Sequence, residues 1–442
     1  MKRYHTRGIL YVLVLGILIT GCGAPAPPTE PLPPPTQTLD PTQEIVETPP
    51  LILESSTAVP DSPPLVFRNG LVITATGADP ISNGAVVIEN GLIIAVGPES
   101  SITVPEDALV IDLEGKTIMP GLIDARASDL LNRLEIEDGQ ISLVSLELYL
   151  RSFLKAGVTT VRATGWVWEE MQTIPELRAA LETHGNTIPS VIIVGTAMAH
   201  SESSGYTKYY RDQLVGVGTV EEAQQVTREL IELGVHQVSF TMSTGPSLNE
   251  APEERLPVLT SDQLMAIVET AHAQDKLVVG QAIFAEEALT SVNAGIDELL
   301  SWPTPIEPLP EELIQALVTH SVPVVSGFSV GGVVPQEGDL RRFLDAGGTL
   351  VYGTFAPNSS GTPVSEFRIM ELNGMTPMEM IQSATTNAAQ VLEMEDMIGT
   401  LEVGKQADII VVDGNPLEDN FLAVIGNVVY VVKNGELVIQ PE

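Results

Sequence analysis

The chain has 442 residues, a length typical of two or three domains or of one large barrel with an addition, and its formal net charge is −37. So acidic a surface cannot replace the counterions of phosphates, which excludes nucleic acid as a partner. A single cysteine excludes a disulfide framework, and six histidines are a small number for a metalloenzyme.

Residues 1–21 are predicted to be a lipoprotein signal peptide. Basic residues precede an apolar run from Ile9 to Thr20, which is too short to span a bilayer as a helix. The run leads through Gly21 to Cys22 in a pattern that resembles the bacterial lipobox, whose cysteine is acylated and becomes the first mature residue. Because Cys22 is the only cysteine, we prefer this interpretation to a plain signal peptide. We expect an extracytoplasmic protein, lipid-anchored to a bacterial membrane in the cell envelope.

Residues 22–64 follow as a proline-rich segment, which is typical of an extended, disordered linker. Residues 65–117 and 404–442 carry short apolar runs with Asn-Gly pairs, at 69–70, 90–91 and 434–435, which favour tight hairpin turns. These two similar ends predict one small composite β-sandwich domain.

Residues 118–403 alternate between strand-like and helix-like segments. Capping boxes at Thr219 with Glu222 and at Thr376 with Glu379 mark helix starts. Alternating strands and helices predict the α/β class, as a (β/α)8 TIM-like barrel. The predicted strands are Ile118–Ala125, Thr159–Ala163, Ser190–Gly195, Gln237–Phe240, Leu277–Gln281, Glu298–Ser301, Pro323–Ser326 and Leu350–Thr354.

Several stretches resemble the amidohydrolase superfamily, in its imidazolonepropionase-like and prolidase-like branch. They are Gly115–Asp124, Ala156–Arg162, Ala384–Ala389 and Ile398–Asp408. The resemblance runs from about 65 to 442 and implies the barrel with its composite β domain. It also implies a metal centre that activates water to hydrolyse C–N and related bonds.

The ligands that this resemblance implies are all replaced. The two histidines expected after strand 1 are Arg126 and Ser128, and the lysine expected on strand 4 is Ser239. The histidines expected on strands 5 and 6 are Gln281 and Ser301. The aspartate expected after strand 8 is Phe355. We therefore expect no zinc or other divalent metal as a cofactor.

The mouth of the barrel offers other groups instead. The predicted ligand-binding residues are Arg126, Ser128, Trp166, Ser239, Gln281, Ser301, Trp302 and Phe355. Aromatic side chains with a few polar groups describe a small-molecule pocket, and the guanidinium of Arg126 suits an anion. The alternative is that large side chains fill the volume that the metals vacated, with Arg126 in a structural ion pair.

We therefore expect a lipid-anchored protein of amidohydrolase type that is inactive as a metallohydrolase, a pseudoenzyme that binds a small anionic ligand or an envelope protein. The alternative is a hydrolase of C–N bonds that uses a reduced or metal-independent site. His200 and Glu202, after strand 3, are then the weak candidates for acid–base catalysis.

Overall fold

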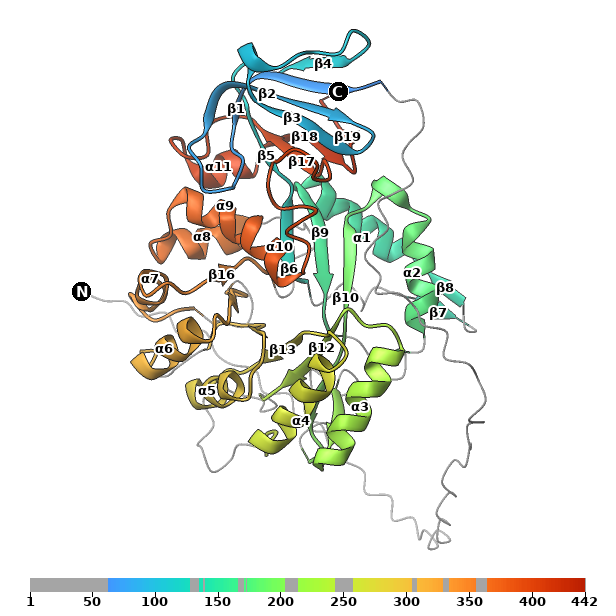
Figure 1. The fold of residues 1–442 in the computed structure, drawn as a ribbon, viewed down its shortest axis with the longest axis vertical. Coiled ribbons are helices and arrows are strands. Elements are labelled where there is room, and N and C mark those ends of the chain that lie inside the picture. Colours follow the sequence, from blue (N-terminus) through green and yellow to red (C-terminus); the bar gives the residue numbers. More distant parts are fainter. Residues whose placement is uncertain are drawn as a thin grey trace, which may run out of the picture. The chain divides into compact units, whose positions relative to one another are not determined.

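The fold consists of a parallel barrel and a separate mixed sheet (Figure 1). The computed structural model describes residues 63–127, 135–137, 140–165, 171, 173–202, 214–242, 257–303, 308–328, 334–354 and 364–441. The predicted fold class, an α/β barrel with a small additional β domain built from both ends of the folded region, is confirmed. The predicted signal peptide, Cys22 and nearly all of the linker lie outside the described residues.

Eight parallel strands form the barrel in chain order, and each has a counterpart among the predicted strands. They are β6 (Leu122–Ala127), β9 (Val158–Ala163), β10 (Ser190–His200), β12 (Gln237–Thr241), β13 (Val278–Gln281), β14 (Glu298–Leu299), β15 (Val324–Val325) and β16 (Leu350–Val351). Within the described residues no ladder joins β6 to β16. The backbone N–H of Ala125 instead donates to the carbonyl of Tyr352 at 3.1 Å, which nearly closes the barrel.

Helices follow the strands and pack apolar faces against them. They are α1 (Val144–Lys155), α2 (Ile174–Glu182), α3 (Val220–Glu232), α4 (Ser261–His272), α5 (Ala285–Asn293), α6 (Glu311–Thr319), α7 (Asp339–Asp345), α8 (Val364–Leu372), α9 (Pro377–Ser383) and α10 (Thr386–Val391). Both predicted capping boxes are confirmed, at the starts of α3 and α9. Each satisfies two backbone donors that a helix start leaves free.

Apolar side chains from the strands fill the barrel interior. Ile123, Val194, Val279 and Val351 belong to one buried cluster with residues of α10 and of the segment after it, as far as Ile398. The segment that includes α10 and runs to Ile398 therefore packs on the strand side chains inside the barrel. A short additional strand, β11 (Leu214–Val217), pairs with β10, and a hairpin joins β7 (Glu135–Glu137) to β8 (Gln140–Ser142).

The second sheet combines both ends of the described chain. It contains β1 (Leu65–Val72), β2 (Ile81–Glu89), β3 (Leu92–Pro98), β4 (Leu109–Asp112), β5 (Thr117–Pro120), β17 (Ile409–Val412), β18 (Val428–Lys433) and β19 (Glu436–Ile439), with α11 (Phe421–Ile425). Antiparallel pairing of β5 with β17 joins the two ends. Asn90-Gly91 and Asn434-Gly435 form the predicted hairpin turns, because both residues of each pair adopt positive φ.

Two sequence predictions need correction. Asn69-Gly70 makes no hairpin turn: it lies within β1, at a register shift against β2, with Asn69 at φ 56°. The predicted strand Ile118–Ala125 is divided between two sheets at Gly121, because β5 belongs to the mixed sheet and β6 to the barrel. A β-carbon at Gly121 would lie 2.3 Å from the Thr159 hydroxyl oxygen, so only glycine fits this crossing.

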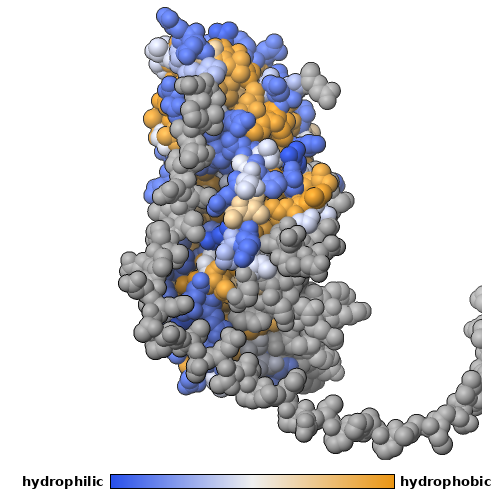
Figure 2. Space-filling model, turned by 90° about the vertical axis from the view of Figure 1, so that its right-hand side faces the viewer, coloured by the Kyte–Doolittle hydropathy of each residue, from blue (hydrophilic) through white to orange (hydrophobic). Residues whose placement is uncertain are grey.

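The surface of the sheet domain is mixed in character. Figure 2 shows hydrophobic residues among hydrophilic ones toward the end of the molecule that carries the sheet domain. Exposed apolar side chains there include Leu92, Ile94, Leu109 and Val110. Within the described part of the chain, no helix has the length and apolar character needed to cross a membrane.

Candidate functional site at the barrel mouth

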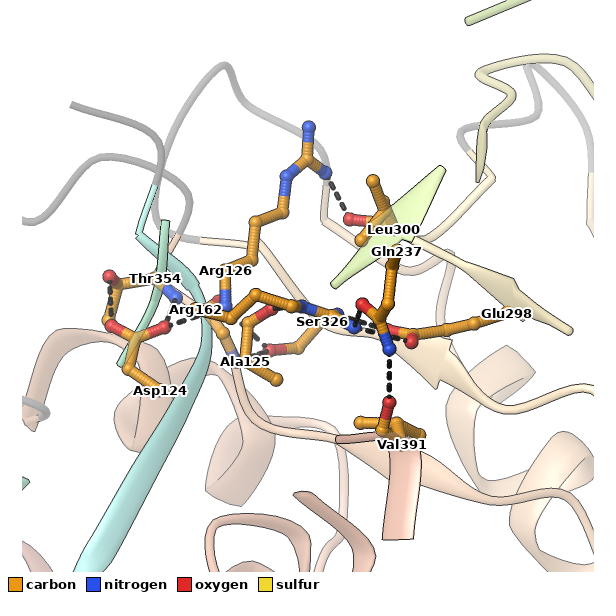
Figure 3. Close-up of polar contacts among 11 residues, drawn as sticks. Asp124, Ala125, Arg126, Arg162, Gln237, Glu298, Leu300, Ser326, Thr354 and Val391 are labelled. Atoms are coloured by element: carbon orange, nitrogen blue, oxygen red, sulfur yellow. Dashed lines mark hydrogen bonds and ion pairs between the residues drawn. The ribbon is translucent and has the colours of Figure 1, made fainter. Parts of the chain in front are cut away.

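Arg126 is the central residue of the site. It lies near the end of β6 and is only 3% exposed. Its guanidinium donates to the backbone carbonyl of Leu300 (Figure 3). It also donates to Oε1 of Gln281 at 3.1 Å. The side chains at two of the replaced ligand positions, 126 and 281, therefore bond directly to each other.

Asp124 fixes the backbone from which Arg126 extends. Its carboxylate accepts the backbone N–H of Arg126 at 3.0 Å and the backbone N–H of Thr354 at 3.1 Å. It also accepts the Thr354 hydroxyl at 2.6 Å. Burial raises the pKa of Asp124, although these hydrogen bonds and the charge of Arg162 oppose the shift. The aspartate thus connects β6 to the segment after β16, across the side of the barrel without a ladder.

A second arginine lies in the same interior and was missed in the sequence analysis. Arg162, on β9, donates to Oε2 of Glu298 at 2.7 Å and to Oε1 of Gln237 at 2.9 Å. Gln237 in turn donates to the carbonyl of Val391 at 2.7 Å (Figure 3). Two signals in the sequence could have indicated this network. Arg162 lies within the apolar strand of residues 158–163, and Glu298 begins another predicted strand.

Ser239 and Ser301, two of the predicted ligand-binding residues, differ in their contacts. The Ser239 hydroxyl donates to the carbonyl of Gly195 at 2.8 Å. The Ser301 hydroxyl is buried and has no partner among the described residues. Both side chains are short and neutral, so neither brings a charge to the barrel mouth.

Trp302 packs among aromatic side chains rather than presenting a face to a ligand. Its indole is 1% exposed and lies edge-on to Phe328, at 6.0 Å between ring centroids, and to Phe343, at 5.6 Å. Phe343 belongs to α7, so the ring belongs to the layer between strands and helices. For this residue the structure favours the filled-core alternative.

His200 and Glu202 lie together at the end of β10. The backbone N–H of Glu202 donates to Nδ1 of His200 at 3.3 Å, which gives the imidazole a role in shaping the turn. His200 is half-buried and the Glu202 residue is exposed. Three other predicted site residues, Ser128, Trp166 and Phe355, lie outside the described residues.

The described donor set does not fit a divalent metal ion. A guanidinium has no lone pair to offer and brings a positive charge to the position of a ligand. The only side-chain carbonyl oxygen of the set, Oε1 of Gln281, already accepts from that guanidinium. In the part of the chain that the structure describes, no group of three histidine, cysteine, aspartate or glutamate residues is arranged to hold a metal.

A nearly closed parallel barrel joined to a composite sheet, with polar side chains where the strands end, defines an α/β-barrel protein. Residues 117–438 match the amidohydrolase family, and the chain belongs to this family. It is 27% identical to an imidazolonepropionase of Geobacillus kaustophilus over 401 residues, covering 78% of this chain and 88% of that protein. An imidazolonepropionase of Brevibacillus brevis is 25% identical over 381 residues, covering 75% and 83%.

Solved structures share the fold. A prolidase complexed with N-methylphosphonate-L-proline superimposes with a TM-score of 0.69 at 24% identity, covering 86% of this chain and all of that chain. The ochratoxinase of A. niger gives a TM-score of 0.69 at 21% identity, covering 86% and 97%. At these identities the likeness concerns the fold alone.

Proposed function

We propose that this chain is an amidohydrolase-family protein of the cell envelope that is anchored through lipid on Cys22, holds no catalytic metal and acts by binding. The contact between Arg126 and Gln281 carries the proposal. A cationic side chain stands at a position where the family resemblance implies a metal ligand, and it engages the oxygen of the side chain at another such position. Two positive charges at one buried place repel strongly, so the guanidinium opposes metal binding.

The proposed ligand is a small anion. An arginine recognises a carboxylate through paired, charge-assisted hydrogen bonds, and Gln281 and Ser301 supply neutral polar groups beside it. Arg126 is fixed in direction by its bonds to Leu300 and Gln281, so little side-chain freedom would be lost on binding.

Metal analysis tests the first part of the proposal. The purified chain is incubated with zinc or manganese, passed through a desalting column and analysed by mass spectrometry of the elements. We expect no retained metal, in the parent and in Arg126→Lys alike. One or two tightly retained ions per chain would refute the proposal.

Ligand binding tests the second part. A panel of small carboxylates is screened by the rise in Tm of the parent chain, with Arg126→Gln as the variant and Arg126→Lys as the control that keeps the charge. We expect a rise that Arg126→Gln abolishes and Arg126→Lys retains in part. A rise that is the same in all three proteins would assign the binding to another place.

Family membership supports a second candidate, a hydrolase of C–N bonds with a reduced or metal-independent site. His200 and Glu202 would then exchange the proton and Arg126 would orient an anionic substrate. Turnover that resists chelators and is lost in His200→Ala would favour this candidate. Binding of an envelope protein without any small-molecule response would favour a docking role instead.

A further inference from the structure

The ion pair between Arg162 and Glu298 is fully enclosed by the barrel. The two side chains are 0% and 2% exposed, and both nitrogens at the end of the guanidinium donate to the carboxylate. A paired geometry of this kind is the strongest that arginine makes with a carboxylate. Because both groups are buried, neither can exchange its partner for water.

This ion pair is connected on both sides to the environment of Arg126. On one side, Nε of Arg162 donates at 2.6 Å to the carbonyl of Ala125, the residue that precedes Arg126. On the other side, Glu298 lies two residues before Leu300, whose carbonyl accepts from the Arg126 guanidinium. The pair therefore restrains both the strand that presents Arg126 and the segment that receives it (Figure 3).

Like the hydrogen bonds, the attraction between the arginines and the Glu298 carboxylate favours the observed position of Arg126. Burial raises the pKa of Glu298, while the positive charges of Arg162 and, more weakly, of Arg126 oppose the rise. Both guanidiniums are therefore attracted to one carboxylate. If that carboxylate is neutralised, the two arginines repel each other within the barrel. Arg126, at 3% exposed against 0% for Arg162, is the less buried of the two.

We infer that the Arg162–Glu298 pair is a positioning device that holds Arg126 at the mouth of the barrel. The inference rests on the proposed function only in the anion-binding role given to Arg126. The location of Arg126 is tested separately, so a failure here is distinguishable from a failure of ligand binding or of metal exclusion.

The test measures how fast phenylglyoxal, which modifies guanidinium groups, labels Arg126 in the full chain, followed by peptide mass mapping. In the parent chain we expect slow labelling, because Arg126 is buried. In Glu298→Gln, which keeps the shape of the side chain and removes its charge, we expect at least about tenfold faster labelling of Arg126.

A matched control separates this local effect from lost stability. Asp408→Asn neutralises the carboxylate of another buried pair, in which Lys433 donates to Asp408 at 2.7 Å. We expect Arg126 to react as slowly in this control as in the parent. Fast labelling in both variants would trace the reaction to general unfolding and would overturn the inference.

A double variant keeps the inference testable if Glu298→Gln does not fold. Arg162→Met combined with Glu298→Met removes both charges and keeps the side-chain volume close to that of the parent. It also deprives the Ala125 carbonyl of its donor, so we expect faster labelling of Arg126 here too. Slow labelling in a folded double variant would show that Arg126 is held without the pair.

Discussion

At the scale of residues, the site is defined by which side chains replace the expected ligands and by what they contact. Arg126 and Gln281 were identified from the sequence because they interrupt otherwise matching stretches. Their mutual hydrogen bond, at 3.1 Å, could not be predicted, since it joins residues 155 positions apart. The Arg162–Glu298 pair was hidden for the same reason: strand periodicity says which face a residue occupies, not which partner it finds across a barrel.

A double-mutant cycle on this pair yields the first prediction. Glu298→Met alone leaves the Arg162 charge buried without its carboxylate, and we expect a loss of about 3–5 kcal/mol in the free energy of unfolding. The double change to methionine should cost far less than the sum of the single changes, because no charge remains unpaired. Urea unfolding of the four proteins measures this coupling, and additive losses would contradict it.

His236 yields a prediction about pH. Burial, together with the nearby charge of Arg178, lowers its pKa from 6.5 to about 4. Its Nδ1 lies 3.0 Å from Nη2 of Arg178 and accepts the backbone N–H of Ile193 at 3.1 Å, so the neutral ring fits the site. Below pH 6.5 the unfolded chain takes up a proton that the folded chain refuses, so stability is full above this pH and falls toward pH 4.

The difference between the two pKa values corresponds to about 3 kcal/mol of stability lost over this range. We expect His236→Gln to flatten the dependence of the unfolding free energy on pH between about 6.5 and 4. His320→Gln, the same substitution at an exposed histidine, is the matched control. An unchanged slope in His236→Gln would contradict this explanation.

At the scale of elements, the sequence predicted most of the fold. The eight barrel strands, both capping boxes and two of three Asn-Gly turns could be predicted because periodicity and cap chemistry are local signals. The division of the first barrel strand at Gly121 could not. It depends on Gly121 donating to the carbonyl of Asp408, a residue of the far end of the chain, and on close contact with Thr159.

Gly121→Ala tests this crossing. The added β-carbon would lie 2.3 Å from the Thr159 hydroxyl oxygen and 2.5 Å from its methyl carbon, both within a packed core. We expect a loss of about 1–3 kcal/mol in unfolding free energy, with partial recovery when Thr159→Ala is added. Gly97→Ala is the control, since its nearest contact would be an ordinary 3.5 Å. Equal losses at both glycines would contradict the packing argument.

At the scale of the whole molecule, the net charge and the proposed lipid anchor have opposite effects on membrane attachment. A net charge of −37 repels an anionic membrane surface, so electrostatic attraction cannot bring this protein to the bilayer. The proposed attachment through Cys22 needs no such attraction, because acyl chains bind through buried methylene groups. Attachment by lipid alone should therefore be insensitive to salt, unlike attachment through charged groups.

Cys22→Ser tests this reasoning in cells that process lipoproteins. We expect the parent chain in the membrane fraction, and in the detergent phase of a Triton X-114 separation, at low and at high salt. Cys22→Ser should move to the aqueous phase, because the thiol that would carry the acyl chains is missing. Ser55→Ala, which changes a hydroxyl in the same proline-rich segment, is the control and should behave as the parent. A Cys22→Ser chain that stayed in the detergent phase would show that another part of the protein supplies the attachment. Release of the parent chain by salt would show that the attaching part is charged.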